Sequence, residues 1–270
     1  MARLLVTGAA GRVGTLLRPL LRRADRVLRL ADVEAIADPQ PGEEVVRLDV
    51  RDAGAVTAAC REVDAILHLA GISGEAPFEE ILQVNVVGTE IVLRAAVATG
   101  VPKVVLASSN HAVGFYRRAD VPPGHDGLPG DLAPRPDTYY GWSKAATESL
   151  GSLYHDRFGL DISALRIGTC IAEPPDTRAL ATWLAPADAA RLVEACLAAP
   201  EPGFRVLWGV SDNRRRWWSL AGPRALGYRP AEVAERYAPD LIARSGPPDL
   251  TDPHHDRVGG PFCTMPLGRT

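Results

Sequence analysis

The stretch TGAAGRVG at residues 7–14 decides the fold. It follows a short apolar run and leads into a helical pattern. Its three glycines, Gly8, Gly11 and Gly14, have the spacing GxxGxxG. Glycines at these positions allow a tight turn and let backbone N–H groups approach a pyrophosphate at a helix N-terminus. A strand, a glycine turn and a helix in this order predict the first unit of a dinucleotide-binding sheet.

The alternation of strand and helix continues along the chain. Short β-branched runs predict strands at 3–7, 26–30, 44–48, 65–69, 103–108 and 162–167. Helical periodicity predicts helices at 11–23, 53–62, 78–99 and 140–158. Such alternation produces right-handed βαβ units. We therefore expect an α/β fold with a Rossmann-type, doubly wound parallel sheet that is covered on both faces.

The pattern becomes less regular after residue 168. It predicts a helix at 186–199, a strand at 204–210 and a tail at 221–270 that is rich in Pro and Gly. Ligands of doubly wound sheets bind at the carboxyl ends of the strands. We therefore expect residues 1–168 to form a dinucleotide-binding core. Residues 169–270 should complete that core and form a small substrate-binding cap, within a single compact unit.

The composition excludes several classes of function. The 270 residues are 46% hydrophobic and 23% charged, with a net charge of −3 and a pI of about 6.1. These values argue against nucleic acid as a partner. No apolar run approaches the ~20 residues that span a membrane, so we expect no membrane partner. Four scattered cysteines favour a reducing cytoplasm. Nothing completes a tetrahedral set around His254 and His255, so we expect no metal.

A carboxylate closes the second predicted strand, at Asp32 in RLAD. It lies about 20 residues after the glycine turn, where a carboxylate can hold ribose hydroxyls and would repel a 2′-phosphate. NAD is therefore favoured over NADP, although a helix-capping aspartate is the alternative. The motifs LDV (48–50) and HLAG (68–71) close the next two strands. The expected cofactor contacts are Gly8, Ala10, Gly11, Arg12, Val13, Gly14, Asp32, Asp49, Val50, Leu69, Ala70, Gly71, Ser108, Tyr140, Lys144 and Ile167.

The stretch YYGWSK at 139–144 offers two tyrosines and one lysine. A helix turns by about 100° per residue, so Lys144 lies within about 40° of Tyr140 but about 140° from Tyr139. A free tyrosine is a poor base at neutral pH, and an ammonium one turn away stabilises the phenolate and lowers its pKa. We therefore expect Tyr140 to act as a general base with Lys144.

With these motifs in this order, the chain resembles the extended short-chain dehydrogenases/reductases, the NAD-dependent epimerase/dehydratase superfamily. The matching pieces are TGAAGRVG, LDV, HLAG, NVVGT, SSN, YGWSK and LRIG. More narrowly it resembles the uronate dehydrogenases, through SSNHAVGFY (108–116), RIGTC (166–170), EPPDTR…TW (173–183), DNRRRWW (212–218) and GGPF (259–262). This resemblance implies NAD-dependent oxidation of a hexuronic acid, D-glucuronate or D-galacturonate, at C1 to the aldarolactone. We also expect a homo-oligomer.

The resemblance also implies a set of substrate contacts. They are Ser73, Ser109, Asn110, His111, Tyr140, Thr169, Arg178 and Phe262. Asn110 stands where the superfamily usually carries a catalytic Ser or Thr, so either Ser109 or Asn110 polarises the substrate hydroxyl. Thr169 stands where the uronate group has a serine and keeps the hydroxyl. The guanidinium of Arg178 matches a carboxylate in a bidentate pair, although an exposed loop arginine is the alternative.

Two other functions remain open. A sugar or sugar-nucleotide epimerase or dehydratase is one, but it needs room for a nucleotide diphosphate, and the stretch after Arg166 is short. A non-catalytic NAD-sensing protein is the other, but it has no need of the Tyr–Lys pair. The run RRRWW at 214–218 is a surface patch, part of the cap or an oligomer contact.

Overall fold

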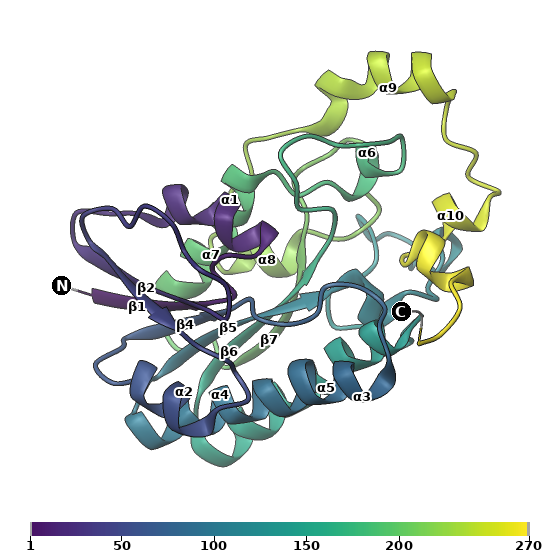
Figure 1. Cartoon of the computed structure of the whole chain (residues 1–270). Helices are drawn as coiled ribbons and strands as arrows, with labels where there is room; N and C mark the ends of the chain where they lie inside the picture. The colour runs from purple at the N-terminus through teal and green to yellow at the C-terminus, as the bar shows by residue number, and fades with distance from the viewer. Residues whose placement is uncertain (1, 269–270) are drawn as a thin grey trace.

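A seven-stranded parallel sheet forms the centre of the computed structural model, which describes residues 2–268 (Figure 1). Its strands are β1 (Ala2–Thr7), β2 (Arg26–Asp32), β3 (Glu43–Arg47), β4 (Ala65–His68), β5 (Lys103–Ser109), β6 (Asp161–Ile167) and β7 (Phe204–Gly209). They lie in the order β3-β2-β1-β4-β5-β6-β7. The order reverses between β1 and β4, which is where doubly wound sheets bind ligands. The predicted sheet is confirmed, with strand bounds within two residues of those expected.

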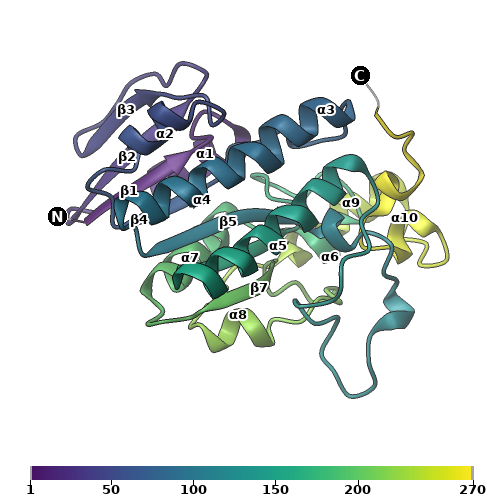
Figure 2. The same ribbon diagram turned by 90° about the horizontal axis from the view of Figure 1, so that it is seen from below.

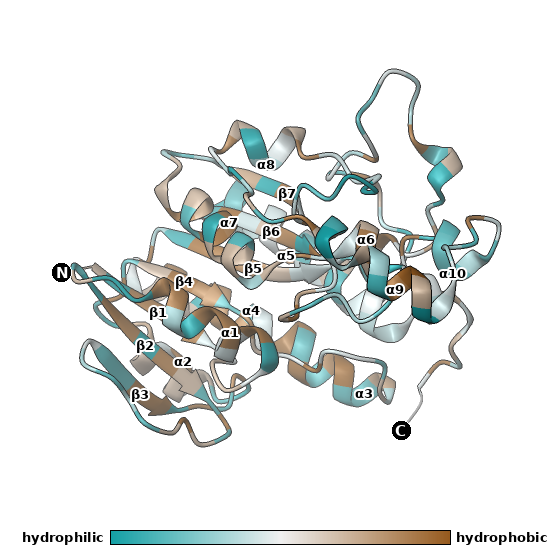
Figure 3. Cartoon of the chain, turned by 90° about the horizontal axis from the view of Figure 1, so that it is seen from above, coloured by the Kyte–Doolittle hydropathy of each residue, from teal (hydrophilic) through white to brown (hydrophobic). Residues whose placement is uncertain are grey.

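Helices cover both faces of the sheet (Figure 2). One face carries α2 (Ala53–Ala59), α4 (Gly88–Thr99) and α5 (Tyr139–Phe158), and the other carries α1 (Arg12–Leu21) and α7 (Pro186–Ala198). Apolar side chains of the strands point into both layers, and Figure 3 shows that β1, β2 and β4 consist largely of hydrophobic residues. The sheet is therefore buried on both sides, as its continuous apolar strands predict.

One long helix runs from α3 (Phe78–Ile81) through a π-helical turn (Leu82–Val87) into α4. Its residues 78–99 are long and apolar enough to cross a membrane, with a mean hydropathy of 1.5 over an 18-residue window. The expectation that no such run exists was therefore wrong. Half of that window is buried inside the protein, where Val92 and Ala96 pack on the sheet. Core helices meet the same test of length and composition.

The last third of the chain continues beyond β7 in short helices. They are α8 (Ala221–Ala225), α9 (Ala238–Ser245) and α10 (Pro253–Asp256), while α6 (Ala179–Thr182) precedes α7. The two tryptophans of the RRRWW run are buried, and Trp218 stacks on Trp208 of β7 with ring centroids 4.5 Å apart. These aromatic side chains therefore belong to the core and not to a surface patch.

Residues 253–268, which we call the C-terminal strap, return to the carboxyl edge of the sheet. The strap is joined to the segment that follows β5: Val258 N–H donates to Tyr116 O at 2.9 Å, and Gly259 N–H donates to Gly114 O at 2.9 Å. Asp256 forms an ion pair with Arg117. The final segment of the described chain thus lies beside residues that are far away in sequence (Figure 1, yellow).

Candidate active site

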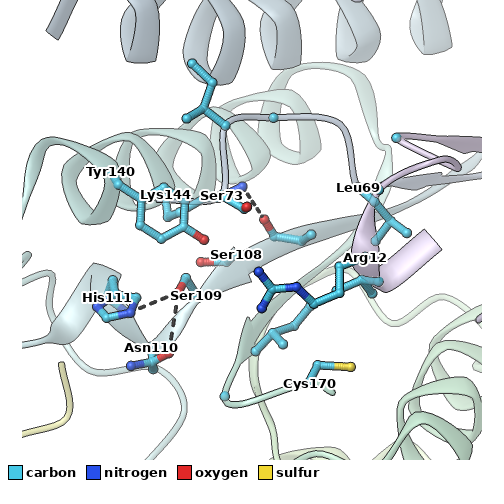
Figure 4. Close-up of a pocket in the computed structure, with 18 of the residues that line it drawn as sticks. Arg12, Leu69, Ser73, Ser108, Ser109, Asn110, His111, Tyr140, Lys144 and Cys170 are labelled. Atoms are coloured by element: carbon cyan, nitrogen blue, oxygen red, sulfur yellow. Dashed lines mark hydrogen bonds between the residues drawn. The ribbon is translucent and has the colours of Figure 1, made fainter. Parts of the chain in front are cut away.

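The carboxyl ends of β1, β4, β5 and β6 meet at a cavity of about 320 Å³ (Figure 4). The strap contributes Phe262 to its wall. Of the expected site residues, the structure brings together Gly8, Gly11, Arg12, Val13, Gly14, Leu69, Gly71, Ser73, Ser108, Ser109, Asn110, His111, Tyr140, Lys144, Ile167, Thr169 and Phe262. The lining also includes residues that were not expected, namely Ile72, Ala107, Gly168, Cys170 and Ile171. Ala10, Asp32, Asp49, Val50, Ala70 and Arg178 do not line this cavity.

The glycine turn has the shape that a pyrophosphate requires. Gly8 has φ of +72°, and a Cβ there would lie 2.5 Å from Ala70 N. A Cβ on Gly14 would lie 2.5 Å from Gly8 O, whereas one on Gly11 would meet only Gly8 O, at 3.2 Å. Close packing thus requires glycine at positions 8 and 14, whereas the absence of a side chain at Gly11 keeps the N-terminus of α1 accessible. Backbone N–H groups at such a helix start suit an anion, so the residues present fit a dinucleotide.

Asp32 stands at the end of β2 and is fixed to the glycine turn. Its Oδ2 accepts Ala10 N–H at 2.9 Å, and its Oδ1 accepts Glu34 N–H at 3.0 Å. The carboxylate is partly exposed and therefore keeps lone pairs for a ribose hydroxyl. Asp49 instead pairs with Arg51 at 2.6 Å, and the guanidinium lowers the pKa of that carboxyl.

The start of α5 separates the two tyrosines. The Thr138 hydroxyl accepts Gly141 N–H at 3.0 Å and caps the helix. Tyr140 and Lys144 face the cavity, with Lys144 Nζ 5.6 Å from the centroid of the Tyr140 ring. Tyr139 lies outside it and packs edge-on against Phe78, with centroids 5.2 Å apart. The expected choice of Tyr140 over Tyr139 agrees with this placement.

Burial controls the pKa of both members of the pair. It lowers the pKa of Lys144 to about 8, although the nearby Glu148 opposes this change. It also raises the pKa of Tyr140, although the adjacent Ser109 hydroxyl opposes that change. The expected lowering of the Tyr140 pKa by Lys144 was therefore wrong for this arrangement. The ammonium donates to Ala107 O at 2.8 Å, while burial and the nearby Asp137 carboxylate both raise the pKa of Tyr140.

A buried charge network accounts for Ser108. Its hydroxyl donates to Glu148 Oε1 at 2.5 Å, and Glu148 pairs with Arg166 at 2.7 Å. Arg166 also donates to the carbonyls of Gly130 and Leu132. The Ser108 hydrogen is thus engaged inside the protein. Sequence reasoning did not single out Glu148, because a glutamate in a helix carries no signal of its buried partners.

The Ser109 hydroxyl donates to Asn110 Oδ1 at 3.5 Å, and each side chain also has a partner of its own. The Ser109 hydroxyl lies beside the Tyr140 phenol and accepts His111 N–H at 3.3 Å. The Asn110 amide Nδ2 donates to Val258 O in the strap at 2.9 Å. Of the two candidates for polarising the substrate hydroxyl, Ser109 is therefore the one that lies beside Tyr140. Figure 4 shows Ser109 between Tyr140 and Asn110.

Arg178 holds the strap with most of its hydrogen-bond donors. One terminal nitrogen donates to His254 O at 2.8 Å and Arg257 O at 3.1 Å, and the other donates to Val258 O at 2.5 Å. Because Val258 O also accepts from Asn110, the guanidinium lies close to the sugar end of the cavity without lining it. Burial lowers the pKa of Arg178. Arg178, which was expected to bind the substrate carboxylate, therefore binds mainly to backbone carbonyls of the strap.

Two further side chains, Asn85 and Glu75, position the loop after β4. Asn85, in the π-helical turn, accepts Ile72 N–H at 2.7 Å and donates to Ser143 Oγ at 2.9 Å. Glu75 accepts Tyr140 N–H at 2.9 Å and Gly268 N–H at 2.8 Å. They join the loop after β4 to α5 and to the strap. Sequence reasoning missed Glu75, because its partners come from distant segments and no local pattern announces them.

Comparison with known proteins agrees with this geometry. The model of the NAD dependent epimerase/dehydratase family matches residues 4–219. The uronate dehydrogenase of Agrobacterium fabrum is 41% identical over 99% of this chain and 98% of its own length. A crystal structure of a mutant uronate dehydrogenase from Agrobacterium tumefaciens complexed with NAD has a TM-score of 0.91, with 41% identity over 98% of both chains. The glucuronic acid dehydrogenase structure from Chromohalobacter salexigens has a TM-score of 0.92, with 37% identity over 99% of this chain and 98% of that one. The chain therefore belongs to the NAD dependent epimerase/dehydratase family and, within it, to the uronate dehydrogenases.

Proposed function

We propose that this protein oxidises a hexuronic acid, D-glucuronate or D-galacturonate, at C1 to the aldarolactone with NAD. The observation that carries the proposal is that Tyr140, Lys144 and Ser109 line the same cavity as the glycine turn. An acid–base group therefore stands beside a place for a dinucleotide. The relatives named above match this chain over nearly its full length, which supports the proposal.

Tyr140, Lys144 and Ser109 would each have a distinct role in the reaction. When bound, NAD supplies the hydride acceptor at C4 of its nicotinamide. Tyr140, as phenolate, takes the proton of the C1 hydroxyl while the C1 hydrogen leaves as hydride. Ser109 donates to the substrate oxygen, and Lys144 stabilises the phenolate and holds the nicotinamide ribose. The ring-closed sugar thus leaves as a lactone, and the products include NADH and one proton.

The carboxylate of the uronate also needs a partner. Arg178 is our proposal, because it lies one carbonyl away from Asn110 and keeps its Nε free of the three strap bonds. Ser73, Thr169 and Phe262 would hold the hydroxyls and the ring. Residues 169–270 would then act as the substrate cap of a single compact unit. A homo-oligomer in the cytoplasm, with neither metal nor nucleic acid as a partner, remains part of the same proposal.

The test is an absorbance assay for NADH with a panel of sugars. We expect turnover of glucuronate and galacturonate, and little with glucose, which lacks the anion, or with glucose 6-phosphate, whose anion has another shape. UDP-glucuronate should be inert because its C1 hydroxyl is blocked. Replacing NAD by NADP tests the role of Asp32: turnover should be lower with NADP, because the carboxylate repels the 2′-phosphate. Turnover of UDP-glucuronate without that of free uronates would instead indicate a sugar-nucleotide enzyme.

A further inference from the structure

His111, one of the expected substrate contacts, pairs at the sugar end of the cavity with Asp137, to which the proposed reaction assigns no role. His111 Nδ1 lies 2.7 Å from Asp137 Oδ2, and the Asp137 side chain has no exposed surface. The imidazole stacks on Phe262 with ring centroids 3.9 Å apart and meets Tyr140 edge-on at 5.7 Å. His111 thus lies between a buried carboxylate and the cavity that it lines.

Two glycines make room for the Asp137 carboxylate. A Cβ on Gly114 would come within 2.0 Å of Asp137 Oδ2, and one on Gly259 would come within 1.9 Å. The second carboxylate oxygen, Oδ1, accepts the Thr138 hydroxyl at 2.9 Å. Among residues 2–268, the side-chain partner of Asp137 Oδ2 is therefore His111, while Thr138 holds Oδ1.

This arrangement determines which imidazole nitrogen carries the hydrogen. An ionised carboxylate can only accept, so His111 Nδ1 donates to it, and the neutral ring keeps a lone pair on Nε2. Within residues 2–268, Nε2 makes no hydrogen bond and is not enclosed. We propose that Asp137 is a positioning residue that fixes this tautomer, so that His111 Nε2 accepts a hydroxyl hydrogen of the uronate. The proposal rests on the proposed function for the identity of the sugar.

Asp137→Asn offers a sharp test because Thr138 dictates how the new amide must lie. The Thr138 hydroxyl accepts Gly141 N–H and donates to the oxygen that now faces it. The amide oxygen should therefore keep that place, and the amide NH₂ should face His111 Nδ1. Because Nδ1 must then accept, the hydrogen moves to Nε2. The variant thus presents a donor to the sugar where the wild type presents an acceptor.

The first measurement is nitrogen NMR of the His111 ring at pH 8, in wild type and variant. We expect hydrogen on Nδ1 alone in the wild type and on Nε2 alone in Asp137→Asn. Asp256→Asn is the matched control, because Asp256 is a buried carboxylate of the strap that pairs with Arg117 and not with His111. It should leave the His111 tautomer unchanged. A wild-type ring protonated on Nε2 overturns the proposal, whether or not the variant folds and whether or not uronates are substrates.

The second measurement is a double-mutant cycle in kcat/KM for uronate. Asp137→Asn should lower it by roughly 10- to 100-fold, the cost of an unpaired polar group, with NAD affinity within about twofold. In a protein that already carries His111→Ala, Asp137→Asn should lower kcat/KM by less than about a further twofold, because Asp137 acts through the imidazole. If the loss in the double mutant equals the product of the two single-mutant losses, Asp137 has a purely structural role and the proposal is overturned.

Discussion

At the scale of single residues, the choice between the adjacent tyrosines gives a first prediction. Tyr140→Phe should retain NAD affinity and lose turnover by about 10²–10⁴-fold, the typical contribution of a placed general base. Tyr139→Phe should be mild, because Tyr139 packs against Phe78 outside the cavity. Steady-state kinetics with glucuronate and NAD titration check both. Substantial turnover by Tyr140→Phe would exclude it as the base.

The titration of the Tyr140–Lys144 pair gives a second prediction. Burial lowers the pKa of Lys144 to about 8 and raises that of Tyr140, so Lys144 gives up the first proton of the pair. In the proposed reaction the active form is a phenolate beside an ammonium, and this form is a fixed fraction of the singly deprotonated pair. kcat/KM should therefore rise with pH up to about 8 and then level off. In Lys144→Met the rise should continue to higher pH; an unchanged plateau would contradict this account.

At the scale of elements, the strap and Arg178 give a third prediction. Arg178→Ala should lower kcat/KM for glucuronate by roughly 30- to several-thousand-fold, the cost of breaking a desolvated charge pair, and leave NAD binding intact. Trace activity with glucose should change little. Arg117→Ala is the control, because it releases Asp256 of the strap and keeps Arg178. Equal losses with glucuronate and glucose would show that Arg178 only clamps the strap.

His68 ties three elements together and gives a fourth prediction. Nδ1 lies 2.7 Å from Thr7 Oγ1 at the end of β1, and Nε2 lies 3.0 Å from Thr89 Oγ1 in α4. Burial lowers its pKa to about 3, so the folded protein keeps it neutral while the unfolded chain protonates it near pH 6.5. Stability is then lost as pH falls below 6.5. From pH 7 to 5 we expect a loss of about 2 kcal/mol in the free energy of unfolding.

The measurement for His68 is urea unfolding at both pH values, in wild type and in His68→Gln. The variant starts less stable, but its decline between the two pH values should be smaller by that amount, because glutamine does not titrate. Parallel declines in the two proteins would mean that other groups carry the acid sensitivity.

At the scale of the whole molecule, the two parts of the chain should unfold as one unit. All five tryptophans lie between Trp142 and Trp218, so their fluorescence reports the second half, whereas circular dichroism reports the entire sheet. We expect the two unfolding transitions to coincide. NAD at about 100 times its Kd should stabilise both by about 2.7 kcal/mol. Separate transitions would show instead that residues 169–270 fold as an independent domain.

Local patterns predicted the sheet, the glycine turn and the Tyr140–Lys144 pair because each depends on neighbours a few residues apart. The surroundings of these groups depend on contacts that no local pattern contains. In the sequence Glu148 is an ordinary helix glutamate, and only the fold brings Arg166 and Ser108 beside it. The sequence suggested that the guanidinium of Arg178 is free to bind a carboxylate, because its three carbonyl partners lie in the distant strap.

The position of the strap in the chain has a consequence for biosynthesis. A ribosome delivers the glycine turn and Tyr140 first and the strap last among the described residues. A nascent chain stopped before residue 253 can form the strands that hold the cofactor. Its Asn110 and Arg178, however, still lack the Val258 carbonyl that they share, and no Phe262 covers His111. We therefore expect such a chain to acquire NAD before it acquires a place for the sugar, so translation itself sets the order in which the two sites mature.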